Sequence, residues 1–328
     1  MSRERRGLVV QVALGVVGLG LLAGVLYGNR GPIREVAARG PDLGRVGWAF
    51  AVYMAAVMVT YGRWYVLVHA VGLPFRPRDA VRLGFIGGLF NLVIPGGIGG
   101  DVVKGAYLCR EQPRRALAIA TMVIDRLVGL LALFLLASLA GAAAWGSAGV
   151  GIRRLIALAW LAAGTGTVGL AVIFSPPLYK PLLRWTAGRR KLHKVLDELA
   201  SMAAAYRSRL GVVLGCLAVS VGIHVGYATA FDLMARALFP AASPTLPQNM
   251  LIFPLVMFTT AVPLPFGALG LTEGISGQLY GLVKFDGGAV AMMGYRVLMY
   301  AGGVIAALVY LANIRQVRDL RDLREASA

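Results

Sequence analysis

Six long, mostly apolar stretches constrain the fold of this chain more than any other feature. An α-helix needs about 20 apolar residues to cross the hydrocarbon core of a bilayer. The six stretches have about this length and contain few charged residues. They predict membrane-spanning helices at Leu8–Gly28, Val46–Val71, Leu117–Trp145, Leu155–Phe174, Gly211–Phe231 and Gly287–Asn313.

The composition excludes the soluble classes of protein. Apolar residues make up 58% of the chain and charged residues 15%, against roughly 45–50% and 25% in soluble proteins. A chain this apolar cannot keep its surface hydrated, and it is too apolar to be disordered. Two cysteines, Cys109 and Cys216, make no disulfide framework or zinc site.

Two further apolar segments are interrupted by proline and glycine. Leu83–Gly100 ends in Pro95-Gly96-Gly97-Ile98-Gly99-Gly100, and Leu246–Thr272 is broken at Pro263–Gly267. Irregular backbone at membrane depth survives only where protein or water satisfies its polar groups. We therefore expect two re-entrant hairpins; two ordinary kinked spans are the alternative. The expected hairpin tips comprise Pro95, Gly96, Gly97, Gly99, Gly100, Pro265, Gly267 and Gly270.

The basic residues predict the orientation of the chain. With six spans and two hairpins, twenty-one Lys and Arg residues lie on the side of both termini and seven on the other. By the positive-inside rule we expect both termini to be cytoplasmic, and we expect the protein to lie in the inner cell membrane. The uneven distribution of Lys and Arg across a membrane accounts for the net charge of +18, so we do not expect nucleic-acid binding.

The segment 178–209 lies on this cytoplasmic side. Apolar residues recur at helical spacing between Leu192 and Tyr206 among basic residues. This pattern predicts an amphipathic helix on an anionic leaflet; a helix packed on the protein's own cytoplasmic face is the alternative. The whole of 1–328 is expected to be one transmembrane domain, with repeats at about 46–145 and 210–313 and a basic tail at 314–328.

A shift of 170 residues superposes the two broken segments. Pro95 falls on Pro265, Gly97 on Gly267, Gly100 on Gly270 and Arg126 on Arg296. Three spans separate the copies, so the second copy is expected to be inverted. Inverted repeats with broken helices are a recurring design of secondary transporters. Coincidence among glycines and prolines is the alternative.

Two arginines are expected near the bilayer centre. Arg126 and Arg296 each lie about 15 Å into a span, where an unpaired arginine costs at least ~2.5–3.5 kcal/mol. Asp101 and Glu273 follow the two hairpin tips and are the expected partners; Asp125 points about 100° away from Arg126 around its helix.

These charges support two interpretations. An arginine fork matches a phosphate, so Arg126, Arg296, Asp101, Glu273, Asp125, Asn91 and Lys104 are candidates for binding or translocating a lipid head group. Alternatively, Asp101 and Glu273 cap helices, and the arginines join hairpins to spans.

The same motifs resemble a known family. Asn91–Asp101 followed by Asp125-Arg126-Leu127-Val128-Gly129, and Pro265–Glu273 followed by Tyr295-Arg296, resemble the lysylphosphatidylglycerol synthase/flippase transmembrane-domain family. The resemblance covers about Leu8–Ile314. It implies an all-α polytopic membrane protein related to the flippase half of bifunctional enzymes. The chain is expected to lack the aminoacyl-transferase domain of those enzymes, so translocation is expected rather than synthesis.

We therefore expect a flippase that moves a phosphate-bearing lipid, aminoacylated or plain, between leaflets. We expect no enzymatic activity, cofactor or metal, and membrane lipids and a separately encoded lipid-modifying enzyme are the expected partners. One alternative is a non-transporting scaffold. Another, less favoured, is an intramembrane aspartyl protease that uses Asp101 and Asp125.

Overall fold

The computed structural model describes residues 3–94, 99–111, 114–186, 188–262, 264 and 268–313. These residues form α-helices joined by short connections, and none of them lies in a strand. The α-helices are α1 (Arg3–Gly28), α2 (Arg30–Arg39), α3 (Leu43–Ala70), α4 (Pro77–Val93), α5 (Gly99–Glu111), α6 (Arg115–Ala144), α7 (Val150–Phe174), α8 (Pro176–Thr186), α9 (Arg190–Ala204), α10 (Leu210–Leu238), α11 (Leu246–Phe258), α13 (Leu271–Gly281) and α14 (Gly288–Ala312). Two 3-10 turns are η1 (Arg207–Arg209) and η2 (Thr259–Ala261).

Among the described residues, five helices are long and apolar enough to cross a membrane. They are α3, α6, α7, α10 (extended by η1) and α14, and they match five of the six predicted spans. The first predicted span corresponds to α1, which bends by 70° into α2 and makes a sixth span if the bent pair crosses together. The chain is thus an all-α polytopic membrane protein.

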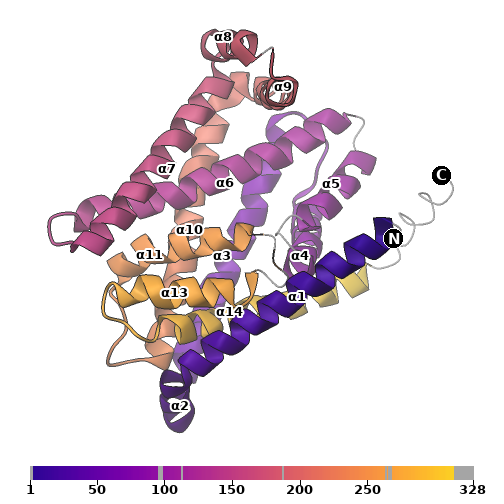
Figure 1. Ribbon diagram of the computed structural model, residues 1–328. Coiled ribbons are helices and arrows are strands. Elements are labelled where there is room, and N and C mark those ends of the chain that lie inside the picture. The colour runs from indigo at the N-terminus through magenta and orange to yellow at the C-terminus, as the bar shows by residue number, and fades with distance from the viewer. Residues whose placement is uncertain are drawn as a thin grey trace.

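The order of elements recurs along the chain. In each half a long helix is followed by two short helices and then by another long helix: α3, α4, α5, α6 and later α10, α11, α13, α14. The two halves pack reciprocally, because α6 lies on α11 and α14 lies on α4, while α3 packs along α10 (Figure 1). This order agrees with the expected repeat; the inverted relation of its two copies stays a prediction.

Glycine permits the close packing of α4 on α5. A Cβ atom on Gly100 would lie 1.9 Å from the backbone oxygen of Gly87, far inside van der Waals contact. Asn91 joins the same two helices, since its Oδ1 accepts a hydrogen bond of 2.8 Å from the Gly100 backbone N–H. The predicted tip residues Gly99 and Gly100 therefore begin α5, while Pro95, Gly96 and Gly97 lie outside the described residues.

The second broken segment is covered by α1. Gly270 has φ of +82° and immediately precedes α13. A Cβ on Gly270 would lie 2.5 Å from the Leu22 backbone nitrogen, so α1 approaches this turn closely. Glycine is required here both by the left-handed backbone and by the contact. Pro265 and Gly267, predicted for the same tip, lie outside the described residues.

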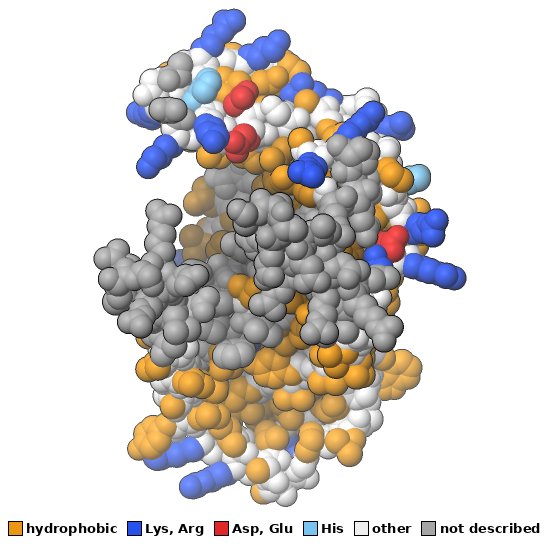
Figure 2. Space-filling model, turned by 90° about the vertical axis from the view of Figure 1, so that its right-hand side faces the viewer, with side chains coloured by type: hydrophobic (Ala, Val, Ile, Leu, Met, Phe, Trp, Pro, Cys, Tyr) orange, Lys and Arg blue, Asp and Glu red, His pale blue; other side chains and the backbone are white. Residues whose placement is uncertain are grey.

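The amphipathic segment expected at 178–209 forms two helices, α8 and α9, at one end of the molecule (Figure 1). It packs partly on the protein's own helices, because Ala203 and Tyr206 are buried and the Tyr206 hydroxyl donates a 2.9 Å hydrogen bond to the Leu67 carbonyl. Leu192 and Val195 stay exposed. Figure 2 shows Lys and Arg side chains gathered over this end, and hydrophobic side chains over much of the lower half of the view.

Placing a methyl group at the α4–α5 contact tests its packing. We expect Gly100→Ala to lower the free energy of unfolding by about 1–3 kcal/mol, the usual cost of overpacking, because the new Cβ meets backbone rather than a mobile side chain. Thermal or denaturant unfolding in detergent measures the change. Gly62→Ala in α3 is the control, since its Cβ would meet no atom within 4 Å; equal behaviour of the two variants would contradict this account of the contact.

Candidate functional site

An ion pair joins α6 to the start of α5. The Arg126 Nε on α6 donates to the Asp101 Oδ2 in the first turn of α5. Both side chains remain accessible, with 50% of Arg126 and 20% of Asp101 exposed. The predicted pairing of Arg126 with the acid that follows the first tip is therefore present, and the pair is open to a ligand.

Arg126 lies on the wall of a cavity of about 250 Å³ between the two halves of the protein. The wall is otherwise built from aromatic, apolar and neutral polar side chains. Its polar members besides Arg126 include Tyr53 and Tyr61 of α3, Asn91 of α4 and Thr260 of η2. A small chamber with one arginine fork and several hydrogen-bonding side chains can hold one anionic group.

The corresponding ion pair in the second half, Arg296–Glu273, is buried. The Arg296 Nε on α14 donates to the Glu273 Oε1 in the first turn of α13, and only 5% and 0% of the two side chains are exposed. The Glu273 Oε2 accepts a 2.7 Å hydrogen bond from the Gly270 backbone N–H. Glu273 therefore caps α13 while it neutralises Arg296, which is the arrangement of a structural pair.

The two acids occupy the same place in their helices. Asp101 is the third residue of α5 and Glu273 is the third residue of α13. A negative charge in the first turn is favourable there because the helix dipole is positive at that end. Each half thus fixes the start of its second short helix with one arginine from the following long helix. Of these two arginines, Arg126 borders the cavity and Arg296 does not.

A third charge pair holds Asp125, which was predicted as a site residue. The Arg63 Nη2 of α3 lies 2.9 Å from the Asp125 Oδ1, and the Arg63 Nη1 donates a 2.6 Å hydrogen bond to the Ser220 hydroxyl of α10. Arg63 is 8% exposed. Asp125 therefore points away from the Arg126–Asp101 pair and links α6 to α3. In the sequence, Arg63 is only a charged residue within the predicted span Val46–Val71. Its partners lie 62 and 157 residues away along the chain.

Lys104 and Asn91 have distinct surroundings. The Lys104 Nζ lies 5.1 Å from the centre of the Trp64 ring, which places it in a cation–π contact. Asn91 both borders the cavity and binds the Gly100 N–H. Asn91 is therefore better placed than Lys104 to meet a ligand beside Arg126.

In the described part of the chain, no three His, Cys, Asp or Glu residues cluster in a way that could hold a metal ion. The arrangement of long apolar helices with ion pairs inside them defines a polytopic α-helical membrane protein.

The family model described as "Lysylphosphatidylglycerol synthase TM region" matches residues 8–307 of the 328-residue chain, so the chain belongs to this family. The match confirms the resemblance inferred from the two motifs. No curated protein and no solved structure gives a significant match.

The difference in burial between the two pairs predicts a difference in stability. Glu273→Ala leaves the Arg296 charge buried without its partner, which costs about 3–5 kcal/mol in such cases. Asp101→Ala leaves Arg126 exposed to the cavity, and we expect a loss of about 1 kcal/mol or less. Unfolding of the two variants in the same detergent measures both losses of stability. A larger loss for Asp101→Ala than for Glu273→Ala would contradict the assignment of the buried Arg296–Glu273 pair as structural.

Proposed function

We propose that this protein is a flippase that moves a phosphate-bearing lipid, aminoacylated or plain, between the leaflets. The observation that carries the proposal is that Arg126 lies on the wall of the cavity between the two halves while its ion pair with Asp101 stays accessible. An arginine whose partner can be exchanged for a phosphate is able to bind a head group and to release it.

The exposure of the pair supports this exchange energetically. An exposed ion pair is worth about 0–1 kcal/mol, and half of the Arg126 side chain is exposed, so a phosphate that enters the cavity replaces Asp101 at little cost. Breaking the buried Arg296–Glu273 pair costs several times more. We therefore assign head-group binding to Arg126, with Asn91 and Asp101 beside it, and a supporting role to Arg296 and Glu273.

The lengths of the short helices support two re-entrant hairpins. α4 has 17 residues, α5 and α11 have 13 each and α13 has 11. At 1.5 Å per residue they reach about 17–26 Å, less than the roughly 30 Å hydrocarbon core. We place α4–α5 as a hairpin that enters from the cytoplasm and α11–α13 as one that enters from the opposite side. Both termini are cytoplasmic in this topology.

The intramembrane aspartyl protease is not favoured by this geometry. Two catalytic aspartates share a proton and lie within about 3 Å of one another. Asp101 instead binds Arg126, and Asp125 binds Arg63. Each carboxylate is thus held by its own arginine.

Transport of a fluorescent anionic phospholipid in reconstituted vesicles tests the proposal. We expect wild type to make the labelled lipid of the inner leaflet accessible to an external quencher, and Arg126→Ala to slow this exchange at least tenfold. Arg126→Lys keeps the charge without the fork and should be intermediate, since a point charge binds phosphate less specifically. The rate of quenching is the measurement.

Arg45→Ala is a matched control for this experiment. Arg45 also forms an exposed pair with an aspartate, Asp42, at 3.3 Å, but it lies at the start of α3 outside the cavity. Its variant should keep the wild-type rate. Equal rates in wild type and Arg126→Ala would remove Arg126 from the mechanism, and a wild type that moves no lipid would favour the non-transporting scaffold.

A further inference from the structure

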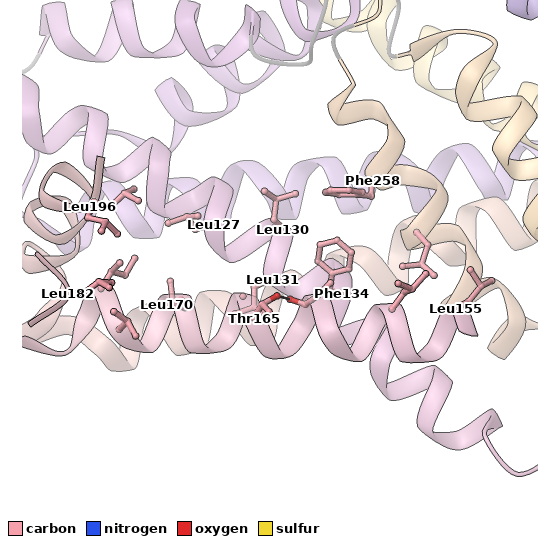
Figure 3. Close-up of a pocket in the computed structure, with 18 residues that line it drawn as sticks. Leu127, Leu130, Leu131, Phe134, Leu155, Thr165, Leu170, Leu182, Leu196 and Phe258 are labelled. Atoms are coloured by element: carbon pink, nitrogen blue, oxygen red, sulfur yellow. Dashed lines mark hydrogen bonds between the residues drawn. The ribbon is translucent and has the colours of Figure 1, made fainter. Parts of the chain in front are cut away.

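A second and larger hollow lies between α6 and α7, away from the Arg126–Asp101 pair. It is a groove of about 910 Å³. α6 contributes Leu127, Leu130, Leu131 and Phe134 to its wall, and α7 contributes the residues opposite them (Figure 3). The contact between α6 and α11 separates the groove from the central cavity, because Phe258 of α11 faces the groove and Met257 faces the cavity.

The chemistry of the wall selects a hydrocarbon. Thr165 is the only residue with a polar side chain among those that line the groove. Its hydroxyl already donates to the Leu161 and Ala162 carbonyls of its own helix, at 2.8 and 3.1 Å. Among its side chains the wall thus offers a polar solute only the accepting oxygen of one hydroxyl. α6 and α7 are both candidate membrane spans, so the groove lies where acyl chains are the solvent.

The groove is long enough for an extended acyl chain. Its wall on α7 runs from Leu155 to Ile173, which is about 27 Å along the helix and close to the full thickness of a hydrocarbon core. Gly166 and Gly169 carry no side chain, so the wall leaves room beside the leucines at these two positions.

One end of the groove is closed by α8 and α9. Leu182 of α8 and Leu196 and Leu199 of α9 complete its wall there, and Figure 3 shows Leu182 and Leu196 at the same end. The His193 ring and the Leu183 carbonyl join the two helices at 3.0 Å. The helices α8 and α9 therefore cover this end of the groove, and their outer faces lie on the protein surface.

This helical pair is strongly basic. Its exposed cations are Lys180, Arg184, Arg189, Lys191 and Lys194, against two exposed acids, Asp197 and Glu198. Trp185 is 68% exposed, and the Arg189 guanidinium lies 5.0 Å from the centre of its ring. Exposed tryptophan together with Lys and Arg is typical of a segment at the level of lipid head groups, and the excess of cations complements an anionic phosphate.

From these observations we infer that the α6–α7 groove and the α8–α9 pair form one binding site for an anionic diacyl phospholipid. The acyl chains lie in the groove and the phosphate lies against the cations of α8 and α9. The site is distinct from the central cavity, and it does not depend on transport through that cavity.

The helix α7 offers a matched pair of variants to test the site. Gly169 lines the groove, and a Cβ built there would meet no atom within 4 Å, so Gly169→Phe places an aromatic ring at the groove without crowding at its Cβ. Gly164 on the same helix is equally open but is not part of the wall. Gly164→Phe therefore controls for the added side chain and for the loss of a helical glycine.

Native mass spectrometry of the purified full chain, equilibrated with equal amounts of phosphatidylglycerol and phosphatidylcholine, counts the bound lipid. We expect wild type and Gly164→Phe to retain one phospholipid with at least fivefold preference for phosphatidylglycerol. Gly169→Phe should lower its occupancy at least fivefold. Equal lipid occupancy in the two phenylalanine variants, or no head-group preference in wild type, would show that the protein retains only bulk lipid. Either result would overturn the proposed binding site.

A second variant tests the head-group end separately. The triple change Lys180→Gln, Arg184→Gln and Lys191→Gln leaves the groove intact, so lipid is still retained. We expect the preference for phosphatidylglycerol over phosphatidylcholine to fall to about one. A preference unchanged from wild type would overturn the assignment of the phosphate to α8 and α9.

Discussion

The cost of an unpaired charge in a low-dielectric interior is the constraint on which the rest of this structure depends. Arg63, Arg126 and Arg296 lie within long helices, and each binds an acid of a different helix. Two of these pairs fix the start of α5 and the start of α13. The glycines beside these two helix starts permit close backbone packing, but they have no side chains that could hold the helices in place. The ion pairs thus position the short helices as well as neutralise the arginines.

The same chemistry serves two purposes in the two halves. Glu273 is fully buried, caps α13 and holds Arg296, so that pair has no room for a ligand. Arg126 borders the cavity, and both it and Asp101 are partly exposed. Each half of the chain thus carries one such pair: the pair of the second half stabilises the fold, and we propose that Arg126 of the first half exchanges its partner for a phosphate. The apolar groove along α6 and α7 lies on the other side of the α6–α11 contact, so a polar and an apolar recess share one wall.

Much of the fold could be predicted from the sequence, because the bilayer imposes a length and an apolar composition on every span. Five predicted spans correspond to long helices, and the pairings Arg126–Asp101 and Arg296–Glu273 follow from the cost of an isolated arginine. The partner of Asp125 could not be predicted, because Arg63 and Ser220 come from distant spans whose relative rotation no local pattern records. The segment 178–209 was expected as one helix, but the chain turns between α8 and α9 so that both can pack at the ends of α6 and α7.

The sequence by itself determined which segments are apolar enough to enter a membrane, where the backbone must break, and which rare charges need partners. These properties are local, since they depend on runs of side chains and on proline and glycine. Only the tertiary structure decided which ion pair stays accessible and where the cavity and the groove lie. Exposure depends on which helices pack over a residue: α1 covers the turn before α13, whereas Arg126 stays open to the cavity between the two halves.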